Sequence, residues 1–185
     1  MANTPSNMLP LGTTAPNFKL PDTKTDLVLT LAEIKGKTAT VVMFICNHCP
    51  FVIHINKTLV AIANNYKSKG VGFVAISSND AVKYPQDGPD NMKLHAEREQ
   101  YPFRYLYDQS QAVAKAYDAA CTPDLYVFDK HLKLVYRGQL DDSRPGNGLP
   151  VTGTDLIHAL DCLLQNKINT KPQKPSIGCN IKWKG

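Results

Sequence analysis

The sequence contains no apolar run long enough to span a bilayer, and residues 1–16 have neither the basic start nor the hydrophobic core of a signal peptide. We therefore expect a cytoplasmic protein without a membrane anchor. With 185 residues, of which 43% are hydrophobic, the chain can form one domain with a full core and needs no disulfide or metal merely to fold. The sequence shows no internal repeat and no second domain.

The sequence also lacks the features of a nucleic-acid-binding protein, although its formal net charge is +5. Residues 1–161 hold 16 basic and 16 acidic side chains, so the excess charge lies in a tail without Asp or Glu. No aromatic stacking platform or helix-turn-helix pattern accompanies its five lysines, which are Lys167, Lys171, Lys174, Lys182 and Lys184. We interpret the tail as a solvated extension and expect neither nucleic acid nor a membrane as a partner.

Local patterns predict a chain in which strands and helices alternate. A strand at 40–45, a helix at 50–68 and a strand at 71–77 form a βαβ unit. Later segments predict a helix ending near 100, a strand at 103–107, a helix at 110–117, a hairpin at 125–136 and a helix from 154. Residues 79–90 are expected to form a surface loop. The tail is expected to be irregular, with the apolar residues of 175–183 packing on the domain.

The most informative motif is a pair of cysteines between the first predicted strand and the helix that follows it. The strand is followed at once by Cys46-Asn47-His48-Cys49, and the helix begins at Pro50. Two cysteines three residues apart can close a small disulfide, and the free amides and dipole of a helix N-terminus favour a thiolate. In a reducing compartment, this arrangement indicates transient redox chemistry rather than a structural cross-link.

The order of these elements, with Cys121-Thr122-Pro123 directly before the later hairpin, resembles the thioredoxin fold. The motif Gly12-x-x-Ala15-Pro16-x-Phe18-x-Leu20 and the segment 103–108 resemble the alkyl hydroperoxide reductase/thiol-specific antioxidant branch, its TlpA-like relatives and an uncharacterised peroxiredoxin-like group. The similarity runs over about 12–165. It implies that the Thr122–Pro123 bond is cis, faces the cysteine pair and exposes backbone groups to an extended substrate.

Departures from this branch bear on the function. Peroxiredoxins carry a Pro and a Thr or Ser ahead of the peroxidatic cysteine; aligned on Cys49, those positions hold Val42 and Cys46. The activating Arg expected near Cys121 is missing. In thioredoxin, a buried Asp helps to deprotonate the second cysteine, and that position is Thr40 here. A reductase built on this pattern is expected to be slow or to take a base from elsewhere.

Each residue of the motif has a predicted role. Cys46 is predicted to be the exposed, attacking thiolate, with a pKa lowered into the range of roughly 3.5–7.5 found for such motifs. Cys49, one turn inward, would resolve the mixed disulfide. His48 would stabilise the thiolate as an imidazolium, unless it is simply an exposed histidine at a helix start. No cofactor is expected.

The other cysteines carry separate expectations. Cys121 lies two residues before Pro123 and is either a third redox partner or a small buried side chain. Cys162 is expected to lie in the core. Cys179 belongs to the only apolar patch of the tail and would be an accessory resolving thiol if that patch docks near the active site. A zinc site is not favoured, because the second Cys or His pair that it needs is absent.

The sequence therefore predicts a thioredoxin fold, an α/β architecture with a central mixed sheet flanked by helices, an N-terminal extension and a helix–strand insertion. Residues 1–165 are expected to form the redox domain, and residues 166–185 a basic, irregular tail that packs on it. The expected function is a thiol–disulfide oxidoreductase that acts on protein or small-molecule disulfides, with a thioredoxin-type protein as electron donor. The alternatives are a thiol-dependent peroxidase and a catalytically silent module that presents the cis-proline groove to a partner.

Overall fold

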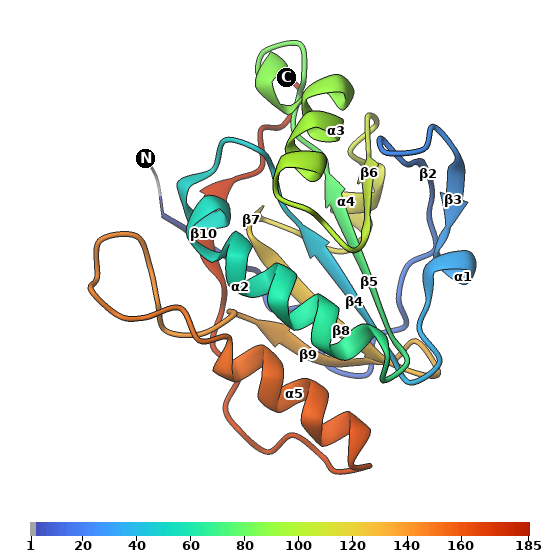
Figure 1. Ribbon diagram of the computed structural model, residues 1–185, viewed down its shortest axis with the longest axis vertical. Coiled ribbons are helices and arrows are strands. Elements are labelled where there is room, and N and C mark those ends of the chain that lie inside the picture. Colours follow the sequence, from blue (N-terminus) through green and yellow to red (C-terminus); the bar gives the residue numbers. More distant parts are fainter. Residues whose placement is uncertain (1–2) are drawn as a thin grey trace.

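The computed structural model describes residues 3–185 and contains a central mixed sheet of five strands (Figure 1). The strands lie in the order β6-β5-β4-β8-β9. β4 is parallel to β5 and β5 to β6, whereas β8 is antiparallel to both β4 and β9. Their bounds are β4 (Ala39–Phe44), β5 (Val71–Ser77), β6 (Arg104–Tyr107), β8 (Asp124–Asp129) and β9 (Leu134–Gly138).

Helices cover both faces of this sheet. Val41 and Met43 of β4 belong to the core on one face and Val42 and Phe44 to the core on the other, and all four are at most 1% exposed. The first face is covered by α2 (Pro50–Lys67), α3 (Pro89–Arg98) and α5 (Thr154–Leu164). In Figure 1, α2 crosses the front of the sheet and α5 lies beside β9. The second face is covered by α1 (Leu31–Ile34), α4 (Ala112–Ala116) and the N-terminal segment. Within residues 3–185, no helix combines the length and the apolarity needed to cross a membrane.

This architecture is the predicted thioredoxin fold. The boundaries of β4, α2 and β5 agree with the predicted βαβ unit to within one residue. The N-terminal extension adds a two-stranded sheet of β2 (Lys19–Pro21) and β3 (Val28–Thr30). The insertion consists of a short 3-10 helix, η1 (Pro85–Asp87), followed by α3 and the edge strand β6. The loop before α3 is only partly a surface loop, because Asn79, Asp80 and Asp87 are buried.

The C-terminal tail contains a strand, so the prediction of an irregular tail is wrong. β10 (Ile177–Asn180) lies between β1 (Thr4–Pro5) and β7 (Cys121–Thr122) in a separate sheet, antiparallel to both. Its partners are distant in the sequence, so local patterning does not reveal it. Cys179 and Ile181 are buried, whereas Trp183 keeps 38% of its surface exposed. Of the five tail lysines, Lys182 is half-buried and the others are exposed.

A buried ion pair lies behind the central sheet. Arg137 Nη2 of β9 is 3.5 Å from Asp124 Oδ2 of β8, and both side chains are fully buried. The same nitrogen donates to the Asp118 carbonyl at 2.9 Å and to the Tyr126 hydroxyl at 3.1 Å. Burial raises the pKa of Asp124 to about 6, although Arg137 acts in the opposite direction. The guanidinium therefore keeps a carboxylate charged in an environment that disfavours it.

We expect Arg137→Met to destabilise the fold by about 3–5 kcal/mol at about pH 8, because the Asp124 carboxylate is left buried without its counter-charge. In the variant the pKa of Asp124 should rise above the present value of about 6. A carboxyl whose folded pKa is raised stabilises the fold below its unfolded pKa and loses that contribution as the pH rises through the folded value. The loss measured by urea unfolding should therefore be smaller at about pH 5.

The control is Lys174→Met, which breaks a solvent-exposed pair with Asp142 and should cost far less stability than Arg137→Met. A loss from Arg137→Met that is equal at the two pH values would show that packing, and not the Asp124 charge, accounts for it.

Candidate redox site

The two cysteines of the motif lie between β4 and α2. β4 ends at Phe44, and Cys49 is the N-cap residue of α2, whose first residue is Pro50. Proline suits that position because it has no backbone N–H, and an N–H in the first helical turn would have no partner within the helix. Both cysteines are free thiols, with Cys46 1% and Cys49 0% exposed. The predicted exposure of Cys46 is therefore wrong, because segments distant in the sequence cover both sulfurs.

The Thr122–Pro123 peptide bond is cis, as the resemblance implies, and it lies against the cysteine pair. Thr122 Oγ1 is 3.5 Å from Cys46 Sγ. The Thr122 carbonyl oxygen is 3.1 Å from Cys49 Sγ and accepts a hydrogen bond from this sulfur when the sulfur carries its proton. The antiparallel pairing of β8 with β4 places Asp124 opposite Phe44 and so fixes this position. Thr122 therefore contacts both cysteines.

Cys49 is the more acidic of the two thiols. The hydrogen bond from Cys46 contributes most to lowering the pKa of Cys49, and the Cys179 thiol, the Thr122 hydroxyl and the Cys179 N–H add to it. Burial opposes these donors, and the resulting pKa is about 5. As the N-cap, Cys49 also lies at the end of α2 where the helix dipole favours an anion. Cys49 is therefore a thiolate at neutral pH.

Cys46 keeps its proton under the same conditions. Its hydrogen bond to Cys49, its burial and the nearby Asp87 carboxylate raise the pKa of Cys46 well above that of an ordinary thiol. The predicted low pKa of Cys46 is wrong for two physical reasons. The N-cap position belongs to Cys49, and a buried carboxylate from a distant loop lies beside Cys46.

Asp87 is the functional residue that the sequence did not reveal. Its Oδ1 accepts a hydrogen bond from the Asn47 backbone N–H at 2.9 Å, and its Oδ2 accepts one from Asn79 Nδ2 at 2.8 Å. Nδ1 of the partly exposed His48 lies 2.7 Å from the same Oδ2. The His48 ring is parallel to the Tyr84 ring at a centroid distance of 6.0 Å. Local sequence around Asp87 predicts only a turn, and nothing in it signals that the carboxylate is buried against residues 46–48.

A metal site is the other chemistry that this cluster could suggest. A Cys46 sulfur, a His48 nitrogen and an Asp87 oxygen lie within 4.8 Å of one another, and zinc uses such ligands. Two ligands about 2.0–2.1 Å from a tetrahedral zinc are roughly 3.3 Å apart. His48 Nδ1 and Asp87 Oδ2 are 2.7 Å apart, which fits direct contact between an imidazole and a carboxylate. The spacing therefore fits contact between the two side chains better than shared ligation of a zinc ion.

The remaining cysteines differ in their positions. Cys179 contacts Cys49, and the hydrogen bond between them lowers the pKa of Cys49. Cys121 is fully buried, its thiol donates to the Pro123 carbonyl at 3.5 Å, and burial raises its pKa. Cys162 is half-buried on α5, 3.6 Å from His158 Nε2, and so lies at the margin of the core rather than within it. Of these three cysteines, Cys179 is thus the one that contacts Cys49.

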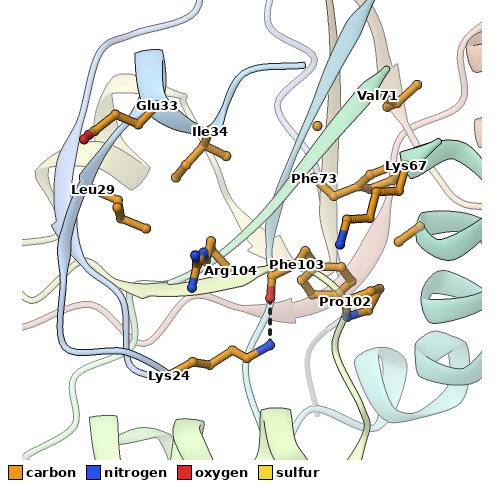
Figure 2. A pocket seen from close by; sticks show the side chains of 12 residues that line it. Lys24, Leu29, Glu33, Ile34, Lys67, Val71, Phe73, Pro102, Phe103 and Arg104 are labelled. Atoms are coloured by element: carbon orange, nitrogen blue, oxygen red, sulfur yellow. Dashed lines mark hydrogen bonds between the residues drawn. The ribbon is translucent and has the colours of Figure 1, made fainter. Parts of the chain in front are cut away.

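Two clefts lie away from these sulfurs. One, of about 420 Å³, is formed at the C-terminal end of α2 and the start of β5 and β6 (Figure 2). Because α2 has 18 residues, this cleft lies roughly 27 Å along the helix from Cys49. Figure 2 shows Lys24 bound to the Phe103 carbonyl, so this cation already has a partner. The other cleft, of about 530 Å³, lies beside α5 and includes Cys162.

Comparison with known proteins gives a family and two close structural relatives. The family model described as Redoxin matches residues 10–155. An uncharacterised conserved protein from Geobacillus kaustophilus is 60% identical, with a TM-score of 0.98 over 100% of this chain and 97% of its own. A hypothetical protein from Sinorhizobium meliloti is 49% identical, with a TM-score of 0.94 over 98% of each chain.

A more distant solved structure shows the fold alone. The thioredoxin domain of a thiol-disulfide oxidoreductase from Bacteroides vulgatus is 20% identical, with a TM-score of 0.60 over 70% of this chain and 89% of its own. Among curated proteins, no relative matches the chain significantly.

The acidity of Cys49 depends on Cys179, and this dependence can be measured. The ultraviolet absorbance of the thiolate should titrate with a midpoint near pH 5 in the native protein. Cys179→Ala should raise that midpoint, because the variant removes a thiol that donates to Cys49. Cys121→Ala removes a neutral thiol and should leave the midpoint in place. A step that survives in Cys49→Ser would assign the thiolate to another cysteine.

Proposed function

Because the chain belongs to the Redoxin family, which supports a thiol-dependent oxidoreductase in general terms, we propose that it is a thiol–disulfide oxidoreductase with Cys46 and Cys49 as its redox pair. The observation that carries the proposal is the unequal acidity of two adjacent thiols, a thiolate at Cys49 beside a protonated Cys46. Such a dithiol has a nucleophile for the first exchange and a second thiol for the resolving step.

The proposed cycle starts when the Cys49 thiolate attacks one sulfur of a substrate disulfide. A mixed disulfide forms at Cys49, and the other substrate sulfur leaves as a thiolate. Cys46 then loses its proton and attacks Cys49 Sγ, so that the Cys46–Cys49 disulfide forms and the second substrate sulfur is released. The substrate gains two electrons and the pair loses two. The roles that the sequence predicts for Cys46 and Cys49 are exchanged in this cycle.

The resolving step needs a base, because the pKa of Cys46 is raised well above that of an ordinary thiol. Asp87 and His48 lie within 4.8 Å of the Cys46 sulfur, which is within reach through one bridging water. His48 is partly exposed and can pass the proton between Asp87 and solvent. In thioredoxin the base is a buried Asp, and Thr40 stands at that position here. Asp87 would thus supply the base that Thr40 cannot.

The partners follow from this chemistry. Substrates are expected to be protein or small-molecule disulfides, and a thioredoxin-type protein is the expected donor that restores the dithiol. A cytoplasmic location, predicted from the sequence, fits both, because cytoplasmic thiols are kept reduced. The chemistry requires no cofactor.

A thiol-dependent peroxidase is the second candidate, because Cys46 occupies the Thr/Ser position of the peroxiredoxin motif and donates a hydrogen bond to Cys49. Cys49 would then attack a peroxide oxygen, become a sulfenic acid as water or alcohol leaves, and condense with Cys46 as water is lost. Arg137 does not activate the pair, since its contacts are to Asp118, Asp124 and Tyr126. Peroxide-driven NADPH consumption with a thioredoxin system separates the two activities.

A Cys46–Cys49 disulfide is the first expected result of the proposal. After mild oxidation, intact mass should show the loss of two hydrogens, and peptide mapping should place the main bond between these residues. Cys49→Ser should abolish disulfide reduction, because it removes the thiolate. Cys46→Ser should slow multiple turnover, because the Cys46–Cys49 disulfide cannot form.

The matched control is Cys162→Ser, which changes a half-buried cysteine outside the site and should leave turnover unchanged. Full reductase activity in Cys49→Ser would show that the nucleophile is assigned wrongly. No turnover with either disulfide or peroxide, together with a stable complex at the cis-proline groove, would favour the silent binding module.

Asp87→Asn tests the base. The variant keeps the shape of the side chain but loses the charge, so the resolving step should slow by about 10²-fold, within the usual range for a general base. Attack by Cys49 on the substrate should change little, so the mixed disulfide should accumulate.

The control for this variant is Asp80→Asn, since Asp80 is also buried in the same loop but binds the Val82 N–H rather than the site. Equal slowing in the two variants would point to a structural effect of the loop and would count against Asp87 as the base.

A further inference from the structure

β10 lies where the resemblance to the thioredoxin fold implies that an extended substrate would pair. Backbone groups beside a cis-proline can pair with a substrate strand. Here β10 takes that position, antiparallel to β7, with Cys179 opposite Thr122 and Asn180 opposite Cys121. Thr122 is also the residue that contacts both Cys46 and Cys49. The tail is therefore held next to the redox pair in the orientation of a bound peptide.

Gly178 shows how closely this strand approaches the cis peptide. A Cβ atom added at Gly178 would collide with the Thr122 carbonyl group and would also meet Pro123 N. A side chain at this position would push the strand away from β7. Glycine directly before Cys179 is thus what lets the strand bring its cysteine to Cys49.

Contacts on both sides of β10 hold it in place. On one side, Ser6 N donates to the Ser176 carbonyl at 2.9 Å, and Ser176 N donates to Ser6 Oγ at 2.9 Å. Beyond the strand, Lys182 N donates to Asn79 Oδ1 at 2.8 Å, and Asp80 N donates to the Lys182 carbonyl at 2.9 Å. Cys179 is therefore positioned by anchors that precede and follow it.

Three sulfurs are consequently close together with graded access to solvent. Cys49 is 0%, Cys46 1% and Cys179 6% exposed. Cys49 is the least exposed of the three and makes hydrogen-bond contact with each of the other two thiols. Cys121 is fully buried, and its thiol points to the Pro123 carbonyl instead.

We propose that Cys179 is a third redox cysteine, which exchanges disulfides with Cys49 and connects the buried pair to external thiols and disulfides. The inference rests on the proposed function, because the exchange starts from the Cys46–Cys49 disulfide. Cys179 loses its proton and its sulfur attacks Cys49 Sγ. The Cys49–Cys179 bond forms, the Cys46–Cys49 bond breaks, and Cys46 takes up a proton. One disulfide replaces another, so the step needs no oxidant or reductant.

The relay determines which substrates the enzyme can use. A disulfide carried to Cys179 lies on the most exposed of the three cysteines, so an external thiol can reach it with less movement of β10 than attack at Cys49 requires. Small thiols and cysteines on flexible protein segments can approach in this way. A rigid substrate strand that had to replace β10 beside Thr122 cannot.

The variant Cys46→Ser tests the exchange in isolation, with oxidised glutathione as the probe. One equivalent should produce a protein that has lost two hydrogens, with peptide mapping showing a Cys49–Cys179 bond. In Cys46→Ser/Cys179→Ser that bond cannot form, and a glutathione adduct at Cys49 should persist. Cys46→Ser/Cys121→Ser is the matched control and should behave like Cys46→Ser. A lasting glutathione adduct in Cys46→Ser, or a Cys49–Cys121 bond, would overturn the proposal.

Gly178→Val supplies an independent measurement through the position of the strand. In the Cys46→Ser background it should slow formation of the Cys49–Cys179 bond at least about tenfold, because the added side chain moves β10 away from Thr122. Circular dichroism checks that the variant folds. With Cys46 present, Gly178→Val should still form the Cys46–Cys49 disulfide. An unchanged rate of Cys49–Cys179 formation in a folded variant would contradict the role of β10.

The two proposals fail in different ways. A native protein that forms no Cys46–Cys49 disulfide, while Cys46→Ser forms Cys49–Cys179, would remove the proposed redox pair and leave Cys179 as the partner of Cys49. A native protein that forms the Cys46–Cys49 disulfide, while Cys46→Ser forms no Cys49–Cys179 bond, would keep the redox pair and remove the relay.

Discussion

The close approach of β10 to the Thr122–Pro123 peptide is the constraint on which the chemistry of this site depends. Gly178 leaves no space between the two segments, so Cys46 and Cys49 are enclosed by protein groups instead of water. In such surroundings each hydrogen bond and each charge has a larger effect than it has in solvent. The acidity of each sulfur is therefore decided by a few named neighbours. The hydrogen bond between Cys46 and Cys49 contributes most to both, followed by Cys179 and Thr122 for Cys49 and by Asp87 for Cys46.

Those neighbours explain why two cysteines of one short motif behave so differently. The donors gather around Cys49, at the end of α2, whereas the carboxylate lies beside Cys46. Cys46 also stands where peroxiredoxins carry a hydroxyl, and a thiol there can donate as a hydroxyl does but can also form a disulfide. At this position, a hydroxyl oxygen can only activate the neighbouring cysteine by a hydrogen bond, whereas the sulfur of Cys46 can also form a disulfide with it.

The parts of this structure that could be predicted are those decided by near neighbours in the sequence. The apolar run of β4, the periodic face of α2 and the cysteines between them specify the βαβ unit. The cis Thr122–Pro123 bond followed from the resemblance to the thioredoxin fold. Asp87 and β10 could not be predicted in the same way. Asp87 acts only because Asn47 and Asn79 enclose it, and β10 is a strand only because β1 and β7 pair with it. Both depend on contacts between distant segments.

The position of β10 in the middle of its small sheet also has a kinetic consequence. Because it pairs with β1 on one edge and β7 on the other, exposing the sulfurs breaks two sets of pairings at once. Segments 4–6 and 176–182 would then open as one cooperative unit, with a free energy below that of global unfolding. Amide hydrogen exchange at Ser6 and Ile181, whose N–H groups bond the Ser176 and Ala120 carbonyls, would report that opening. The rate at which a bulky reagent reaches Cys49 would follow the same fluctuation, independently of the protein's melting temperature.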